Sequence, residues 1–351
     1  MQRASQKKYD KQESVLILTK KAKPKLSVAY NTYWKFAAER QNIFFRRFNG
    51  ENSPWTKDKI LSQYKFTNVY RATDRVSQYL IKNVIYTGSQ KPEEVFFRIL
   101  LFKIFNRIST WEVLESEFGK ISFKDYSFKR YDRVLSEVMQ HKIPIYSAAY
   151  IMASGRSTFG YERKHQNHLK LIELMIKEKV PSKLQHCKSM NEAYNLLHSY
   201  PTIGDFLAYQ YVTDINYSTL TNFSEMEFVK AGPGAKDGIV KCFKDFGEYS
   251  FEDIIRLMAD NQEKEFDRLN LDFQNLWGRN LQLIDCQNVF CEVDKYSRVA
   301  HPQIMGYSHR TRIKQKFADK EKEQIEFYFP PKWGINNLKL NNHGRATKHF
   351  H

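Results

Sequence analysis

A hydrophobic spacing of three to four residues, which recurs along most of the chain, is the feature that most constrains the fold. Within residues 26–48, Tyr30, Trp34 and Ala38 follow one another at four-residue steps, as on the buried face of an α-helix. Alternating apolar and polar residues, the pattern of a half-buried strand, are nearly absent. We expect a short extended piece only at residues 217–229, so the sequence predicts a mainly α-helical body.

Helix start and stop signals divide this spacing into separate elements. Asn49-Gly50 ends the first helix, and Thr56 with Asp58 opens the second. Pro92 stands at an early position of a helix that follows Ser89. No unit repeats at a period of roughly 20–50 residues, which argues against a solenoid. The remaining predicted helices lie near residues 68–83, 110–118, 124–140, 163–179, 189–199, 204–214, 235–245, 250–268 and 278–292.

Most of the positive charge lies at the ends of the chain. The 351 residues carry a net charge of +17, of which residues 1–25 hold +6 and residues 297–351 hold +7. We expect two basic, partly flexible end segments, the C-terminal one with little structure of its own, that contact a polyanion without sequence choice. A basic protein whose charge only aids solubility would have the same total. The body, residues 26–296, is predicted to comprise an N-terminal helical part, 26–150, and a second part, 151–296.

The cysteines and the apolar stretches restrict the compartment. Four cysteines without a C-x-x-C pair favour reduced thiols in the cytoplasm or nucleus over a disulfide framework. Cys286 and Cys291 fit no standard zinc spacing, so we expect no metal and no cofactor. The most apolar stretch, residues 95–105, contains Arg98 and Lys103 and is too short to span a bilayer. The sequence therefore predicts no membrane insertion and no secretion signal.

A turn between two predicted helices, Tyr200-Pro201-Thr202-Ile203-Gly204, is the first candidate for a nucleic-acid contact. A glycine-containing turn presents the free N–H groups of a helix N-terminus to a phosphate, and such a contact positions a protein on DNA without reading sequence. Thr202 and Gly204 are the candidate DNA-binding residues. An ordinary connection between two helices has the same composition.

A glycine-rich loop, Ala231–Ile239, is the second candidate. Gly232, Gly234 and Gly238 permit close approach of the backbone to a phosphate or pyrophosphate, and Lys236 adds a cation for DNA. The chain contains no G-x-x-x-x-G-K-[ST] motif, which disfavours a P-loop kinase. A tight turn between helices would also account for these glycines.

A polar stripe within residues 285–298 is the third candidate. On a helix, Asp285, Asn288 and Glu292 share one face, which Lys295 and Arg298 continue. The apolar neighbours Val289 and Phe290 favour a semi-buried site, which Tyr296 would also line. A surface row of ion pairs is the alternative.

Arginines interleaved with aromatic residues form the fourth candidate. Arg40, Arg46 and Arg47 follow Trp34, and Arg71 follows Tyr70. This mixture suits phosphate contacts combined with base stacking. A helical core braced by Arg–carboxylate bridges is the alternative, and it suits most of these residues.

Together these segments resemble the α-glutamyl/putrescinyl-thymine pyrophosphorylases, thymine hypermodification enzymes of helix–hairpin–helix DNA-glycosylase-like fold. They are also similar to the helical domain attached to 5-hydroxymethyluracil DNA kinases. The resemblance covers about residues 28–300. It is carried by Trp34, Glu39-Arg40, Arg46-Arg47, Pro54-Trp55-Thr56, Asp58, Phe66–Arg71, Asp74-Arg75, Ile203-Gly204, Phe206, Ala208-Tyr209-Gln210, Gly232–Ala235, Cys291-Glu292, Lys295-Tyr296 and Arg298.

The resemblance implies a transferase that acts on double-stranded DNA. A 5-(pyrophosphooxymethyl)uracil base would be flipped from the helix, and an amine or amino acid would replace its pyrophosphate. Residues 232–238 would then cradle the pyrophosphate, and Lys295, Arg298 and Arg71 would neutralise its charge. Glu292 or Asp285 would serve as the base or stabilise the developing cation.

One position departs from the family pattern, and two other functions stay open. An Asp is expected before Phe223-Ser224-Glu225, and this chain has Asn222, so Glu225 takes that role or the position is not catalytic. Asp214 is another nearby carboxylate. A DNA N-glycosylase for a modified base and a non-catalytic partner of a base kinase are the alternatives. Family members occur chiefly in bacteriophages, which implies the cytoplasm of an infected bacterium, or the nucleus for a eukaryotic member.

Overall fold

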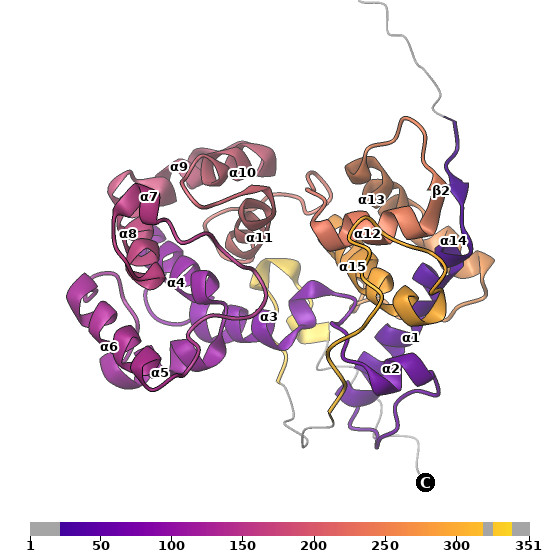
Figure 1. Cartoon of the computed structure of the whole chain (residues 1–351), viewed down its shortest axis with the longest axis horizontal. Coiled ribbons are helices and arrows are strands. Elements are labelled where there is room, and N and C mark those ends of the chain that lie inside the picture. The colour runs from indigo at the N-terminus through magenta and orange to yellow at the C-terminus, as the bar shows by residue number, and fades with distance from the viewer. Residues whose placement is uncertain (1–21, 319–325, 339–351) are drawn as a thin grey trace, which may run out of the picture.

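The computed structural model describes residues 22–318 and 326–338, and the rest of the two predicted end segments lies outside this range. The body is mainly α-helical, as predicted. Two groups of helices lie side by side in Figure 1. Lobe I holds α4 to α11, residues 92–216, and lobe II holds α1, α2 and α12 to α15. Both predicted parts of the body therefore contribute helices to each lobe.

Lobe II is built around α1 (Val28–Phe48) and α15 (Leu283–Ala300). Ser27 caps α1 by accepting the N–H of Ala29 at 3.0 Å, and Tyr33 donates from α1 to the carbonyl of Cys286 at 3.1 Å. Trp34 is fully buried and meets the Phe266 ring edge-on. The other elements of the lobe are β1 (Lys25–Leu26), α2 (Lys59–Gln63), α12 (Pro233–Cys242), β2 (Phe243–Asp245), α13 (Phe251–Asp260) and α14 (Gln262–Arg268). The two short strands pair antiparallel.

Lobe I surrounds α4 (Pro92–Phe105), which is buried on nearly every side. Its interior Arg98 is satisfied by carbonyl oxygens, those of Val84 at 2.9 Å and Ser89 at 2.9 Å among them. The apolar stretch noted in the sequence is thus a central helix. No helix in the described ranges has the length and apolarity needed to cross a bilayer. The covering helices are α5 (Ile108–Phe118), α6 (Phe128–Gln140), α7 (Arg156–Phe159), α8 (Lys164–Lys177), α9 (Val180–His186), α10 (Met190–His198) and α11 (Asp205–Asn216).

The segment that joins the lobes differs from the predicted helix at 68–83. It consists of a 3-10 turn, η1 (Arg71–Thr73), then α3 (Arg75–Tyr79) and a π-helical turn, η2 (Leu80–Ile85). Asp74 accepts the N–H of Asn68 at 2.8 Å, and Arg40 donates to the Asn68 side chain at 2.6 Å. These side-chain bonds hold residues 68–70 in a non-helical path, and a regular α-helix begins only at Arg75.

The prediction of an extended piece at residues 217–229 is wrong, because this segment is a loop without a strand. The side chain of Asn216 both donates to the carbonyl of Phe223 and accepts its N–H, at 3.0 and 2.9 Å. A side chain that takes both backbone groups leaves none for a neighbouring strand at that point.

Part of the predicted C-terminal tail belongs to the core. Phe327, Phe329 and Ile335 are buried, and Phe327 meets Phe44 of α1 with ring centroids 5.1 Å apart. The segment continues through a 3-10 turn, η3 (Pro331–Trp333). Residues 326–338 dock because their aromatic side chains complete an apolar surface that α1 and Trp277 leave uncovered.

Candidate functional site

Arg71 connects the two lobes through its backbone and its side chain. Its N–H donates to Asp285 Oδ1 of α15 at 2.9 Å, whereas its guanidinium pairs with Asp214 Oδ1 of α11 at 2.7 Å. The guanidinium also donates to Gln210 Oε1 at 3.1 Å and to the hydroxyl of Tyr217 at 3.2 Å. The side chain is 3% exposed, so it is a part of the lobe junction and does not contact solvent.

Asp214 holds a second buried cation. Lys103 Nζ lies 3.1 Å from Asp214 Oδ2 and 4.6 Å from the centroid of the Tyr150 ring. Burial alone would raise the pKa of Asp214, but Arg71 and Lys103 outweigh burial and hold it below its ordinary value. Burial lowers the pKa of Lys103 in spite of the carboxylate. The junction therefore contains two cations on one carboxylate, all three removed from water.

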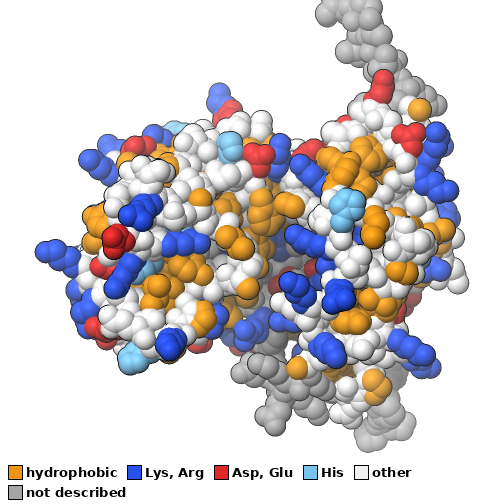
Figure 2. All heavy atoms as spheres, viewed as in Figure 1, with side chains coloured by type: hydrophobic (Ala, Val, Ile, Leu, Met, Phe, Trp, Pro, Cys, Tyr) orange, Lys and Arg blue, Asp and Glu red, His pale blue; other side chains and the backbone are white. Residues whose placement is uncertain are grey.

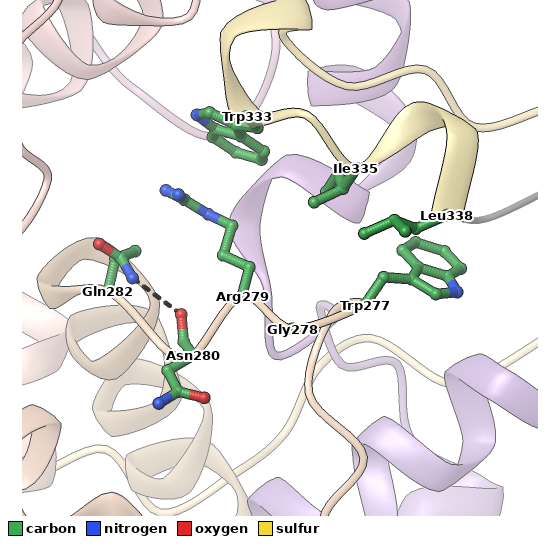
Figure 3. Close-up of a pocket in the computed structure, with 8 residues that line it drawn as sticks. All are labelled: Trp277, Gly278, Arg279, Asn280, Gln282, Trp333, Ile335 and Leu338. Carbon is green, nitrogen blue, oxygen red and sulfur yellow. Dashed lines mark hydrogen bonds between the residues drawn. The ribbon is translucent and has the colours of Figure 1, made fainter.

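A cavity of about 440 Å³ opens between the turn before α15 and the C-terminal segment (Figure 3). Arg279 points toward Trp333 across it, with the guanidinium carbon 3.8 Å from the indole centroid. The same guanidinium pairs with Glu225 at 2.8 Å. The lining residues are Trp277, Gly278, Arg279, Asn280, Gln282, Trp333, Ile335 and Leu338.

Asp285 lies between this pocket and the lobe junction. Its Oδ2 accepts the N–H of Gln282, which lines the pocket, at 3.1 Å, and its Oδ1 accepts the N–H of Arg71. Burial raises the pKa of Asp285 to about 7, although both backbone donors lower it. The carboxyl group does not line the pocket itself and is linked to its wall through the backbone of Gln282.

Lys332 fastens the C-terminal wall of the pocket to the loop that carries Glu225. Its ammonium group donates to the carbonyls of Ser218 at 3.1 Å and Thr221 at 2.8 Å. Burial of that group lowers the pKa of Lys332 to about 8, whereas the negative charge of Glu225 raises it. Glu225 therefore lies near two cations, Arg279 and Lys332.

The predicted polar stripe of α15 does not form one site. Glu292 accepts the N–H of Thr67 at 3.0 Å and pairs with Lys295 at 2.6 Å, so both face the loop before Arg71. Asn288 accepts a long hydrogen bond from Gln287. Only Asp285 of this stripe reaches the pocket wall and the lobe junction. Tyr296 donates to Asp58 at 2.7 Å, and Arg298 pairs with Asp294, so these two serve packing within lobe II.

The glycine-rich loop is not an open phosphate cradle. A Cβ atom on Gly238 would lie 2.1 Å from the carbonyl oxygen of Phe290, and one on Gly234 would lie 3.1 Å from Cys291 Sγ. Both glycines allow α12 to pack closely against α15. At Gly232 the space for a Cβ is taken by the Phe206 ring, and its N–H donates to Gln287 at 3.2 Å. Lys236 lies over the Phe251 ring.

The N-terminal arginines are engaged within the protein. Arg40 is 8% exposed and donates to the carbonyl of Thr67 at 3.0 Å. Arg46 donates to the carbonyl of Trp55 and pairs with Glu39, and Arg47 lies 4.9 Å from the Trp55 ring centroid. The core-bracing alternative describes these three residues better than a DNA contact does.

The turn between α10 and α11 connects two helices, as predicted. Thr202 adopts φ +69°, a left-handed conformation that glycine favours, and Gly204 is the exposed N-cap of α11. Its contact with DNA stays a prediction.

None of the eight residues that line the pocket was a predicted site residue, Trp277, Arg279 and Trp333 included. In the structure Trp277 and Gly278 both have positive φ angles, so α15 starts at Leu283 and not at the predicted residue 278. Trp333 lay in the part that we predicted to be a tail. In the described ranges no group of three or more His, Cys, Asp or Glu side chains is arranged to hold a metal ion.

Comparison with known proteins identifies the family. The family model described as "5-hmdU DNA kinase, helical domain" matches residues 27–306. The chain belongs to this helical-domain family. A 5-hmdU DNA kinase of Bacillus phage SP10 is 27% identical over 285 residues, which cover 76% of this chain and 44% of that relative. The chain thus aligns with less than half the length of the relative, and no solved structure matches.

This result confirms the resemblance to the kinase-associated helical domain, whereas the pyrophosphorylase family stays a prediction. The matched residues include Arg279, Glu225 and the lobe junction. They end before residues 326–338, which supply the second wall of the pocket.

Proposed function

We propose that this protein modifies a thymine-derived base in DNA, replacing the pyrophosphate of a 5-(pyrophosphooxymethyl)uracil with an amine or amino acid. Family membership supports the DNA substrate, since the phage relative is by name a kinase for 5-hmdU in DNA. The chain has no Walker A motif, so we do not propose that it shares the kinase activity of this relative. The reaction proposed here would use a phosphorylated form of the base.

The main support for the proposal is Arg279, which lines a pocket with two tryptophans and pairs at 2.8 Å with the buried Glu225 behind it. A volume of about 440 Å³ lies within the roughly 300–1,000 Å³ of small-molecule sites. The partly exposed Trp333 gives the pocket an aromatic wall for a flipped base, whereas Trp277 is 8% exposed and packs among Phe rings. Arg279 offers donors for phosphate oxygens, and Glu225 offers a base.

The chemistry assigns one role to each charged group. The N1 lone pair of the uracil ring pushes electrons toward C5 as the bond between the exocyclic carbon and the pyrophosphate oxygen breaks. Arg279 stabilises the charge that develops on the leaving pyrophosphate. The amine nitrogen then attacks the exocyclic methylene, the ring electrons return, and Glu225 takes the proton that the new ammonium group releases.

Arg71 and Asp285 act as positioning residues in this proposal. Both are buried, and Asp285 holds the backbone of Arg71 and of Gln282, which lines the pocket. The net positive charge of Arg71, Lys103 and Asp214 favours an anionic substrate nearby. We propose no chemical role for Glu292 and Lys295, which lie in the C-terminal half of α15 and pair with each other.

Product analysis tests the proposal. Duplex DNA with 5-(pyrophosphooxymethyl)uracil is incubated with the protein and a panel of amines and amino acids, and its nucleosides are identified by mass spectrometry. An amine adduct with equimolar pyrophosphate supports the transferase. Free base with an abasic site would instead identify an N-glycosylase.

Binding without turnover on any modified DNA would identify a helical partner of a base kinase. The alignment supports this second candidate function, because the chain aligns with less than half the length of a kinase. Substitutions of Arg279 or Glu225 distinguish the two functions, because they would reduce turnover by a transferase and would have no turnover to reduce in a non-catalytic partner.

A further inference from the structure

Residues 301–318 follow a fixed path across the face of lobe II, in front of α15 (Figure 1). The N–H of Ser308 donates to Asp237 at 3.0 Å, and Arg298 donates to the carbonyl of Arg312 at 3.1 Å. Further along, the N–H of Lys65 donates to the backbone carbonyl of Gln315 at 3.1 Å, and the N–H of Phe317 donates to the backbone carbonyl of Gln63 at 2.9 Å. Because backbone groups make most of these bonds, the path does not depend on the identity of the exposed side chains. We call residues 308–317 the basic strap.

The cations of the basic strap occupy every second position. Arg310, Arg312, Lys314 and Lys316 are all exposed, whereas Ile313 packs on the core. Phe317 meets the Trp55 ring, with centroids 6.4 Å apart. In an extended chain alternate side chains share a face, at a separation of about 6.6 Å for two residues.

Among the residues that the structure describes, no acidic side chain pairs with any of these four cations. Residues 301–318 contain no Asp or Glu. In the described parts of the chain, the ion pairs involve other cations. Figure 2 shows Lys and Arg side chains gathered on lobe II along the hollow between the lobes, where this segment runs. A row of exposed like charges on a fixed backbone is costly unless an anion meets it.

We infer that the basic strap binds the phosphate backbone of one DNA strand and lays the DNA along the hollow between the lobes. A regular row of cations matches a polymer with regularly spaced single negative charges, and Arg and Lys bind phosphate through charge-assisted hydrogen bonds. The identity of the polymer as DNA rests on the proposed function. The strap reads no base, because its contacts are with phosphate.

Salt dependence of binding to unmodified duplex DNA tests this inference. The test variant replaces Arg310, Arg312, Lys314 and Lys316 with Gln. The control variant replaces four exposed lysines of lobe I with Gln and so has the same net charge: Lys124, Lys129, Lys177 and Lys183. Affinity is measured by fluorescence anisotropy between about 50 and 200 mM salt.

The test variant should flatten the slope of log K against log salt by about 3.6, since each phosphate contact contributes about 0.9. The control variant should keep the wild-type slope. Equal slopes in wild type and test variant, or equal losses in both variants, would overturn the inference. Loss of binding to RNA or to anionic lipid vesicles without loss of duplex DNA binding would overturn it as well.

A composition-neutral variant tests the alternation itself. Exchanging Thr311 with Arg312 and Lys314 with Gln315 keeps every residue type and moves two cations to the other face of the strap. About half of the slope change should follow, and an unchanged slope would refute a one-sided row.

The two proposals fail independently. Binding to unmodified DNA requires no base chemistry, so a strap-dependent slope without any transfer product would retain the basic strap and refute the proposed reaction. Transfer activity with a salt slope that ignores the strap would do the reverse.

Discussion

Replacing Asp214 with Asn tests whether the lobe junction depends on a buried carboxylate. Asp214 is fully buried, and its two oxygens meet Arg71 at 2.7 Å and Lys103 at 3.1 Å. Asn keeps the shape of the side chain and removes the charge. Two cations then lie in the interior with no counter-charge, and breaking such a buried pair costs about 3–5 kcal/mol of unfolding free energy.

The measurement is chemical denaturation monitored by two probes, so that two-state behaviour is checked. Asp245→Asn is the matched control, because Asp245 pairs with Lys25 on the exposed surface at 3.1 Å, where water screens the pair and its loss should leave stability almost unchanged. Replacing Lys103 with Met in the Asp214→Asn background removes one stranded cation and should restore about 1–3 kcal/mol.

The pH dependence has a definite sign. Arg71 and Lys103 lower the pKa of Asp214, so its stabilisation is complete above the ordinary carboxyl pKa of 3.8 and is lost as the pH falls through the lower folded value. The gap between wild type and Asp214→Asn should therefore stay constant near neutrality and narrow only in acid. A gap no larger than that of the Asp245 control would refute the role assigned to the junction.

Two further predictions concern α15. Burial raises the pKa of Asp285 to about 7, so between about pH 4 and pH 7 the folded protein retains a proton that the unfolded chain releases, and stability falls as the pH rises. Across that window the unfolding free energy of wild type should fall by up to about 4 kcal/mol, and Asp285→Asn should abolish this fall in a denaturation series. The same fall in the variant would contradict the raised pKa of Asp285. Gly238→Ala should destabilise by about 3 kcal/mol or more, because its Cβ would lie 2.1 Å from the Phe290 carbonyl oxygen. Gly204→Ala has open space and should cost no more than about 1 kcal/mol, so equal losses by thermal or chemical denaturation would count against the packing argument.

The helices of both lobes could be predicted from the sequence because their signals are local. The four-residue steps of Tyr30, Trp34 and Ala38 mark the buried face of α1, and Asp58 caps α2 by accepting the N–H groups of Ile60 and Leu61. Prediction failed where a side chain takes the backbone groups that a strand would use. Asn216 is the example, because its contacts with Phe223 are specified by the folded loop.

The candidate site was less predictable because its residues meet across long stretches of chain. Glycines suit both a phosphate loop and a close helix contact, and only the position of Phe290 decides for Gly238. Arg279 and Trp333 carry no local mark of their stacking, which depends on how residues 326–338 dock. Glu225 was named from a motif, whereas its pairing with Arg279 depends on the tertiary fold.

The most direct test of the central claim compares two carboxylate variants in the transfer reaction. Wild type, Glu225→Gln and Glu292→Gln are incubated with duplex DNA that contains 5-(pyrophosphooxymethyl)uracil and with an accepted amine, and the nucleosides are quantified by mass spectrometry. We expect an amine adduct with wild type, a loss of about 100-fold or more with Glu225→Gln, and near wild-type yield with Glu292→Gln. No adduct with the wild-type protein, or full yield from a folded Glu225→Gln variant, would contradict it.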